Sequence, residues 1–118
     1  MNLSEKIRMA EALTELGVDV LEAGFAIASP GDFESVKTIA ETIGQRDDTP
    51  VLASLCRAGA QDVMAAVNAL KAAKRKRIHI VIATSELHMR EKLRLEPDEV
   101  IKQTVESIKL ARQHADDV

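Results

Sequence analysis

Apolar residues recur every three or four positions from Leu3 to Leu16, which is the spacing of one face of an α-helix. Asn2 and Ser4 are both suitable N-cap residues, and Gly17 follows the last apolar residue, where helices often end. The sequence therefore predicts an amphipathic helix over this segment.

The same spacing predicts three further helices. The second has Ser29 as its N-cap and Pro30 at its first position, and it ends near Gly44. The third begins at about Ala60, and the fourth begins at Pro97. The expected buried face of the second helix consists of Phe33, Val36, Ile39, Ala40 and Ile43. That of the third consists of Val63, Ala66, Val67 and Leu70, and that of the fourth of Val100, Ile101, Val105, Ile108 and Ala111.

Three short apolar runs separate these helices, and we interpret them as strands. They cover residues 18–23, residues 51–55 or 51–56, and residues 78–83, where β-branched side chains dominate. The strands begin 33 and 27 residues apart with a helix in each interval, which is typical of consecutive βαβ units in a parallel sheet. Residues 116–118 resemble the start of one more strand.

An α/β chain with parallel βα units fits two architectures: a doubly wound sheet of flavodoxin type, or part of a TIM (β/α)8 barrel, which needs roughly 250 residues. This chain starts with a helix that has no strand before it, and it stops where a strand begins. We therefore expect a partial TIM barrel of about three strands and four helices. Residues 1–118 would form a single incomplete catalytic-domain segment.

The composition argues against several classes of function. The chain has 118 residues, a net charge of −3, two Phe and no Trp or Tyr, so it lacks the stacking platforms and cationic excess of a nucleic-acid-binding protein. We interpret its basic run from Lys71 to Arg77 as a solvated helix end. No apolar stretch is long enough to span a membrane. The single Cys56 and the absence of a signal sequence favour a reducing compartment, so we expect a cytoplasmic protein.

Polar side chains stand at the expected carboxyl ends of the strands, where parallel α/β folds build their sites. These side chains are Glu22, Arg57, Thr84 and Ser85. In the third strand, alternation separates His79 and Val81 from Ile78, Ile80 and Ile82. The apolar isoleucine face suits packing against helices, so His79 is expected to point into a barrel interior.

Each candidate also has a purely structural interpretation. Glu22 could pair with a neighbouring cation such as Arg57, His79 could be a structural hydrogen-bond donor, and Thr84 and Ser85 could cap a turn. No His or Cys cluster has the spacing of a zinc site, and there is no glycine-rich phosphate loop. The residues alone predict a polar site at the strand ends without specifying a reaction.

Two runs occur together at a characteristic separation. One covers residues 17–25 and continues into 28–33; the other covers residues 77–85 and continues into 87–89 and 92–93. Together they resemble the 2-isopropylmalate synthases, a family of metal-dependent TIM-barrel condensing enzymes, over essentially the whole chain. The resemblance implies a segment that runs from the first helix to the beginning of the fifth barrel strand.

The resemblance also implies a reaction. Acetyl-CoA condenses with the keto carbon of 2-oxoisovalerate, and hydrolysis of the thioester gives 2-isopropylmalate in leucine biosynthesis. In the family, His79, Thr84 and Ser85 would lie at the keto acid, while Glu22 and Arg57 would shape the same pocket. Homocitrate and citramalate synthases share this scaffold, which leaves the identity of the 2-oxo acid open.

The same family uses a divalent metal ion, Mg, Mn or Zn, to polarise the keto acid. Its ligands lie in an Arg-Asp-Gly-Glu-Gln run and a His-x-His run, and neither run occurs in this sequence. We therefore expect no metal ligand, no catalytic residue and no activity in this chain alone. The alternative is a non-catalytic α/β module that assembles with itself. In either case the open sheet edges predict a homo-oligomer.

Overall fold

The computed structural model describes residues 1–82 and 96–118. Its elements in chain order are α1 (Leu3–Leu16), β1 (Val20–Phe25), α2 (Pro30–Thr42), the 3-10 helix η1 (Ile43–Gln45), β2 (Val51–Arg57), α3 (Ala60–Ala69), β3 (Lys76–Val81) and α4 (Pro97–Arg112). The strands form one parallel sheet in the order β1-β2-β3. The alternation of strands and helices predicted from the sequence is confirmed.

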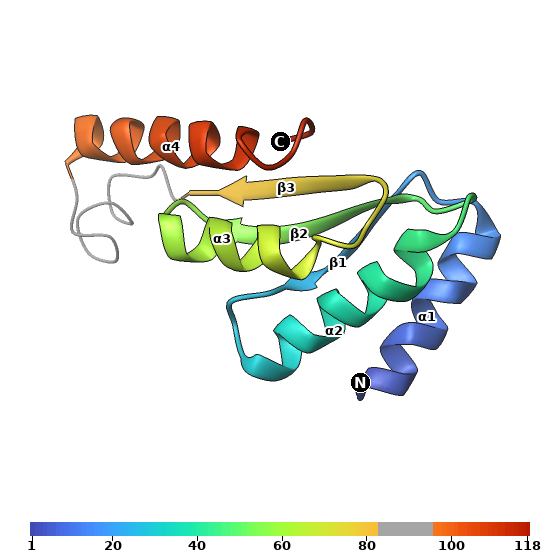
Figure 1. Cartoon of the computed structure of the whole chain (residues 1–118). Helices are drawn as coiled ribbons and strands as arrows, with labels where there is room; N and C mark the ends of the chain where they lie inside the picture. The colour runs from blue at the N-terminus through green and yellow to red at the C-terminus, as the bar shows by residue number, and fades with distance from the viewer. Residues whose placement is uncertain (83–95) are drawn as a thin grey trace.

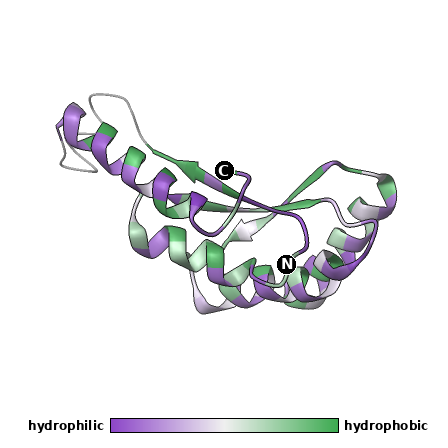
Figure 2. Ribbon diagram, turned by 45° about the horizontal axis from the view of Figure 1, so that its top comes forward, coloured by the Kyte–Doolittle hydropathy of each residue, from purple (hydrophilic) through white to green (hydrophobic). Residues whose placement is uncertain are grey.

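The helices cover one side of the sheet. In Figure 1, α1, α2 and α3 lie on the same side of the strands, and α4 runs along β3 and packs against α3. Buried side chains between the two layers form the core, among them Leu21, Leu52, Cys56 and Ile78 from the strands and Val36, Ile39, Val63 and Leu70 from the helices. Figure 2 shows the strands as mostly hydrophobic and the helices as mixed, as expected for amphipathic helices on a sheet.

The other side of the sheet carries no helix among the described residues. Strand register and alternation place a set of side chains there, which we call the uncovered face: Val20, Glu22, Phe25, Ala53, Leu55, Arg57, Arg77, His79 and Val81. The predicted separation of His79 and Val81 from Ile78 is confirmed, since Ile78 is fully buried and Val81 is 37% exposed.

Local signals determine the helix ends. The side chain of Asn2 accepts a hydrogen bond from the backbone N–H of Glu5, so Asn2 rather than Ser4 caps α1. Gly17 closes α1 with a φ of 90°, a conformation that glycine adopts readily. Ser29 caps α2 through the N–H of Asp32, as the sequence predicts.

Both ends of β1 differ from the sequence-based prediction, and β2 extends one residue farther than expected, to Arg57. β1 begins at Val20 instead of Val18, because the N–H of Val18 donates to the carbonyl of Leu13 and still belongs to the end of α1. β1 also continues through Gly24, where the register with β2 shifts after Glu22 in a bulge.

β3 begins at Lys76, which pairs with Leu52 of β2. The last part of the basic run is therefore a strand, and the interpretation of this run as a helix end was wrong. The expected end of this strand at Ala83 lies outside the described residues.

The buried face of α4 was also predicted incorrectly. Val100 and Ala111 are buried, but Ile101, Val105 and Ile108 are exposed. The helix packs instead through a face that includes polar residues: Ser107 is 4% exposed. The side-chain amide of Gln103 donates to the carbonyl of Ala58 at 2.8 Å, and this contact helps to set the rotation of α4 on the β2–α3 loop.

The end of the chain lies beside β3. Asp117 forms a parallel bridge with Arg77, and the N–H of Ile78 donates to the carbonyl of Asp117 at 3.1 Å. Arg77 Nε lies 2.9 Å from both carboxylate oxygens of Asp117. The described residues show a single isolated bridge here and no strand, so the start of a strand at residues 116–118 stays a prediction. Across residues 1–82 and 96–118, no helix has both the length and the apolar character needed to cross a membrane.

Candidate functional site

Glu22 and His79 meet on the uncovered face. Glu22 Oε1 lies 2.7 Å from His79 Nδ1, although Glu22 belongs to β1 and His79 to β3. β2 runs between these two strands, so the contact crosses the middle strand of the sheet. The structure thus brings together two of the predicted site residues that lie 57 positions apart in the sequence.

Arg57 at the end of β2 is held by a residue that the sequence analysis did not single out. Its backbone N–H and Nε donate to Asp62 Oδ2 at 3.0 and 2.9 Å, and its Nη2 donates to Asp62 Oδ1 at 3.3 Å. The hydrogen bonds and charge of Asp62 raise the pKa of the Arg57 guanidinium above its ordinary value. The guanidinium also lies 5.6 Å from the centroid of the Phe25 ring, within range of a cation–π contact.

The proposed structural pairing of Glu22 with Arg57 is not formed, because Glu22 binds His79 and Arg57 binds Asp62. One signal in the sequence could have identified Asp62. It is an acidic residue in the first turn of the helix that directly follows β2, close enough in the chain to reach the end of the strand.

Thr84 and Ser85, the other two predicted site residues, lie outside the described residues. Both follow β3, the strand that carries His79. Their proximity to Glu22 and Arg57 stays a prediction.

Cys56 is unsuited to nucleophilic chemistry. Its side chain is fully buried, and burial together with the charge of Asp62 raises the pKa of the thiol to about 11. A thiol with this pKa stays protonated at neutral pH, whereas the thiolate is the reactive form. Cys56 is therefore part of the core.

No metal centre is present within residues 1–82 and 96–118, since no group of three or more His, Cys, Asp or Glu side chains there could hold a metal ion. The Glu22–His79 pair supplies two ligand types, and the part of the chain that the structure describes adds no third ligand to it. A metal with this chemistry usually takes at least three protein ligands at a catalytic site.

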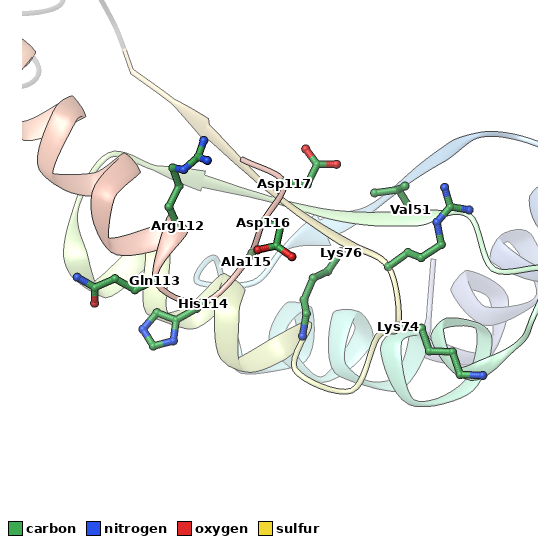
Figure 3. A pocket seen from close by; sticks show the side chains of 10 residues that line it. Val51, Lys74, Lys76, Arg112, Gln113, His114, Ala115, Asp116 and Asp117 are labelled. Carbon is green, nitrogen blue, oxygen red and sulfur yellow. The ribbon is translucent and has the colours of Figure 1, made fainter.

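A pocket of about 510 Å³ lies at the opposite end of the sheet, where β2 and β3 begin, and Figure 3 shows its lining. Three of its cations already have partners: Lys74 reaches Asp47, Arg75 donates to the carbonyl of Thr49, and Lys76 donates to that of Lys71. None of the predicted site residues line it. The uncovered face that carries the Glu22–His79 contact, with Arg57 at the carboxyl end of β2, is therefore the better candidate site. The expectation that Glu22 stands at the end of its strand was wrong, because β1 continues to Phe25.

Comparisons with known proteins show the family of this chain. The HMGL-like family matches residues 1–118. Over 118 residues the chain is 54% identical to a 2-isopropylmalate synthase of Chromobacterium violaceum, 52% to one of Thiobacillus denitrificans and 49% to one of Heliobacterium modesticaldum. Each match covers 100% of this chain and 22% of the relative, so the chain spans about a fifth of the length of these relatives. The parallel βα units are those of a partial TIM barrel, and the chain belongs to the HMGL-like family.

Proposed function

We propose that this chain is a catalytic-domain segment of a 2-isopropylmalate synthase and that it contributes one wall of the 2-oxo acid pocket. The observation that carries the proposal is the Glu22–His79 contact on the uncovered face, with Arg57 farther along the same face at the carboxyl end of β2, in a chain that matches such enzymes along its whole length. TIM-barrel enzymes build their sites at this end of the sheet.

The side chains suit a 2-oxo acid, which presents a carboxylate and a keto oxygen. Asp62 accepts hydrogen bonds from Nε and Nη2 of Arg57 and so orients the guanidinium. No hydrogen bond from Nη1 is formed within the described residues, and we propose that Nη1 donates to the ligand. A guanidinium is a strong partner for a carboxylate. The ring of His79 adds a second polar group on the same face, and the hydroxyls of Thr84 and Ser85 would complete the wall.

We place the divalent metal expected from the resemblance on residues outside the described ones, because residues 1–82 and 96–118 form no metal centre. The role of this segment would then be to bind and orient the 2-oxo acid. The expected substrates are a 2-oxo acid and acetyl-CoA, and the free, buried Cys56 agrees with the proposed cytoplasmic location.

A chimera tests the proposal directly. The 118 matching residues of the Chromobacterium violaceum enzyme are replaced by this chain, and release of CoA from acetyl-CoA is measured with 2-oxoisovalerate, 2-oxoglutarate or pyruvate as acceptor. We expect turnover with 2-oxoisovalerate, and a loss of about 10-fold or more in kcat/KM for His79→Ala. A folded chimera without turnover contradicts the proposed function. Preference for another acceptor would favour a homocitrate or citramalate synthase.

We further propose that the isolated chain self-associates. The order β1-β2-β3 leaves one edge of β1 without a strand among the described residues, and Val20 and Val81 on the uncovered face are 40% and 37% exposed. Unpaired strand edges and exposed apolar surface favour association, and a second copy of the chain offers both.

A further inference from the structure

The Glu22–His79 contact spans an unusual distance for a pair of strand residues. Neighbouring strands are about 4.8 Å apart, so β1 and β3 are separated by roughly 10 Å across β2. The two side chains nevertheless approach to 2.7 Å. Such a bridge is possible only if the side chain that β2 places between them is small.

Ala53 is the small one of the two β2 side chains that flank the contact on this face, and Leu55 is the other. Ala53 pairs in register with Glu22 on one side, and it lies two residues before Leu55, the register partner of His79. Ala53 is only 3% exposed although it lies on the uncovered face, which indicates that neighbouring side chains extend over it. A larger residue at this position would occupy the space that the bridge crosses.

We propose that Glu22 is a positioning residue for His79 and that Ala53 is the spacer that permits the contact; this inference rests on the proposed function of the site. An ionised carboxylate can only accept hydrogen bonds, so the neutral imidazole must donate from Nδ1. Nε2 is then the ring nitrogen with a lone pair. Nε2 of His79 would therefore accept a hydrogen bond or proton from a donor in the pocket, whereas the carboxylate and keto oxygens of the 2-oxo acid, which only accept, would be bound by donors such as Arg57.

The role of the pair is orientation more than stability. The side chains of His79 and Glu22 are 49% and 47% exposed. Exposed pairs contribute little to folding because water screens them and their side chains lose entropy. Substitutions at Glu22 are thus expected to change the state of the His79 ring while the fold persists.

The tautomer of His79 tests this inference without any need for activity. We would record nitrogen NMR spectra of the labelled 118-residue chain at a pH where the ring is neutral. We expect a protonated Nδ1 in the unchanged chain, and conversion to the Nε2-protonated form, which a histidine side chain prefers in water, in Glu22→Ala. Glu34→Ala, which removes an exposed carboxylate from α2, is the matched control and is expected to change nothing.

Variants at Ala53 test the spacer. Ala53→Leu is expected to release Nδ1 as Glu22→Ala does, while Ala53→Gly keeps the bridge. A ring that is Nε2-protonated in the unchanged chain, or a tautomer that is the same in Glu22→Ala, would overturn the inference. Because the Glu22 side chain is half exposed, we expect Glu22→Ala to fold. Glu22→Ala therefore tests the inference even if Ala53→Leu does not fold.

The chimera separates this inference from the proposed function. There, Glu22→Ala is expected to lower kcat by about 10-fold with a smaller change in the KM for acetyl-CoA. Activity that survives Glu22→Ala but not His79→Ala overturns the positioning role and leaves the proposed function standing. A folded, inactive chimera overturns the proposed function, while the NMR result still reports on the contact itself.

Discussion

Asp62→Asn is expected to weaken the attachment of β2 to α3 at the edge of the candidate site. Asp62 Oδ2 accepts two hydrogen bonds from Arg57, at 3.0 and 2.9 Å, and Oδ1 accepts a third at 3.3 Å. Asparagine has a single side-chain oxygen. With that oxygen in the place of Oδ2, its NH2 group would face the Nη2 donor of Arg57, so one bond is lost and the other two lose the negative charge of their acceptor.

The burial of the pair sets the size of the effect. Hydrogen bonds to a charged group contribute about 1.5–3 kcal/mol and neutral ones about 0.5–1.5 kcal/mol. The Asp62 side chain is 12% exposed, but Arg57 is 67% exposed, so water compensates part of the loss. We therefore expect the free energy of unfolding to fall by about 1–2 kcal/mol.

Asp48→Asn is the matched control. Asp48 also binds an arginine through both oxygens, with Arg46 Nε and Nη2 each at 2.8 Å, but its side chain is 60% exposed. The same chemical change should therefore have a much smaller effect there. Urea unfolding followed by far-ultraviolet circular dichroism is the assay, since the chain has no Trp or Tyr for fluorescence. Equal losses of stability in the two variants would refute the argument that burial determines the contribution of this pair.

Four further outcomes are expected. Gly44→Ala should lower the free energy of unfolding by about 1–3 kcal/mol, because the added Cβ would lie 3.0 Å from the backbone Cα of Ala73. Gly31→Ala is the control and should leave the stability unchanged, since the atom nearest to its added Cβ is 3.7 Å away. Similar melting temperatures for the two variants would contradict this prediction. The hydrogen bond from Ser29 lowers the pKa of Asp32, so Ser29→Ala should return the pKa of Asp32 toward 3.8 in an NMR titration. The stability that this hydrogen bond adds to the fold is present above pH 3.8 and is lost as the pH falls. The isolated chain should release no CoA above background with Mg²⁺ or Mn²⁺, acetyl-CoA and 2-oxoisovalerate, and turnover would show that it holds a complete site. Sedimentation equilibrium at micromolar concentration should detect a dimer or larger species, and a folded monomer would contradict self-association.

The sequence by itself determined the features that depend on neighbours along the chain. Asn2 and Ser29 cap helices because a side-chain oxygen satisfies backbone N–H groups two or three residues later. Alternation assigned His79 and Ile78 to opposite faces because successive strand residues point to opposite sides. The helix in each interval between strands predicted the parallel sheet. The match along residues 1–118 assigned the chain to the HMGL-like family.

Only the tertiary structure decided which side chains meet. Periodicity could not predict that Gln103 would rotate the apolar residues of α4 toward solvent, because that contact joins it to the distant Ala58. The partner of Glu22 depends on the strand order, on the bulge after Glu22 and on the size of Ala53 in the strand between. Such contacts are set by register and packing between segments far apart in the chain. A local pattern places each of these residues on a face of the sheet, but it does not specify the residue it will contact there.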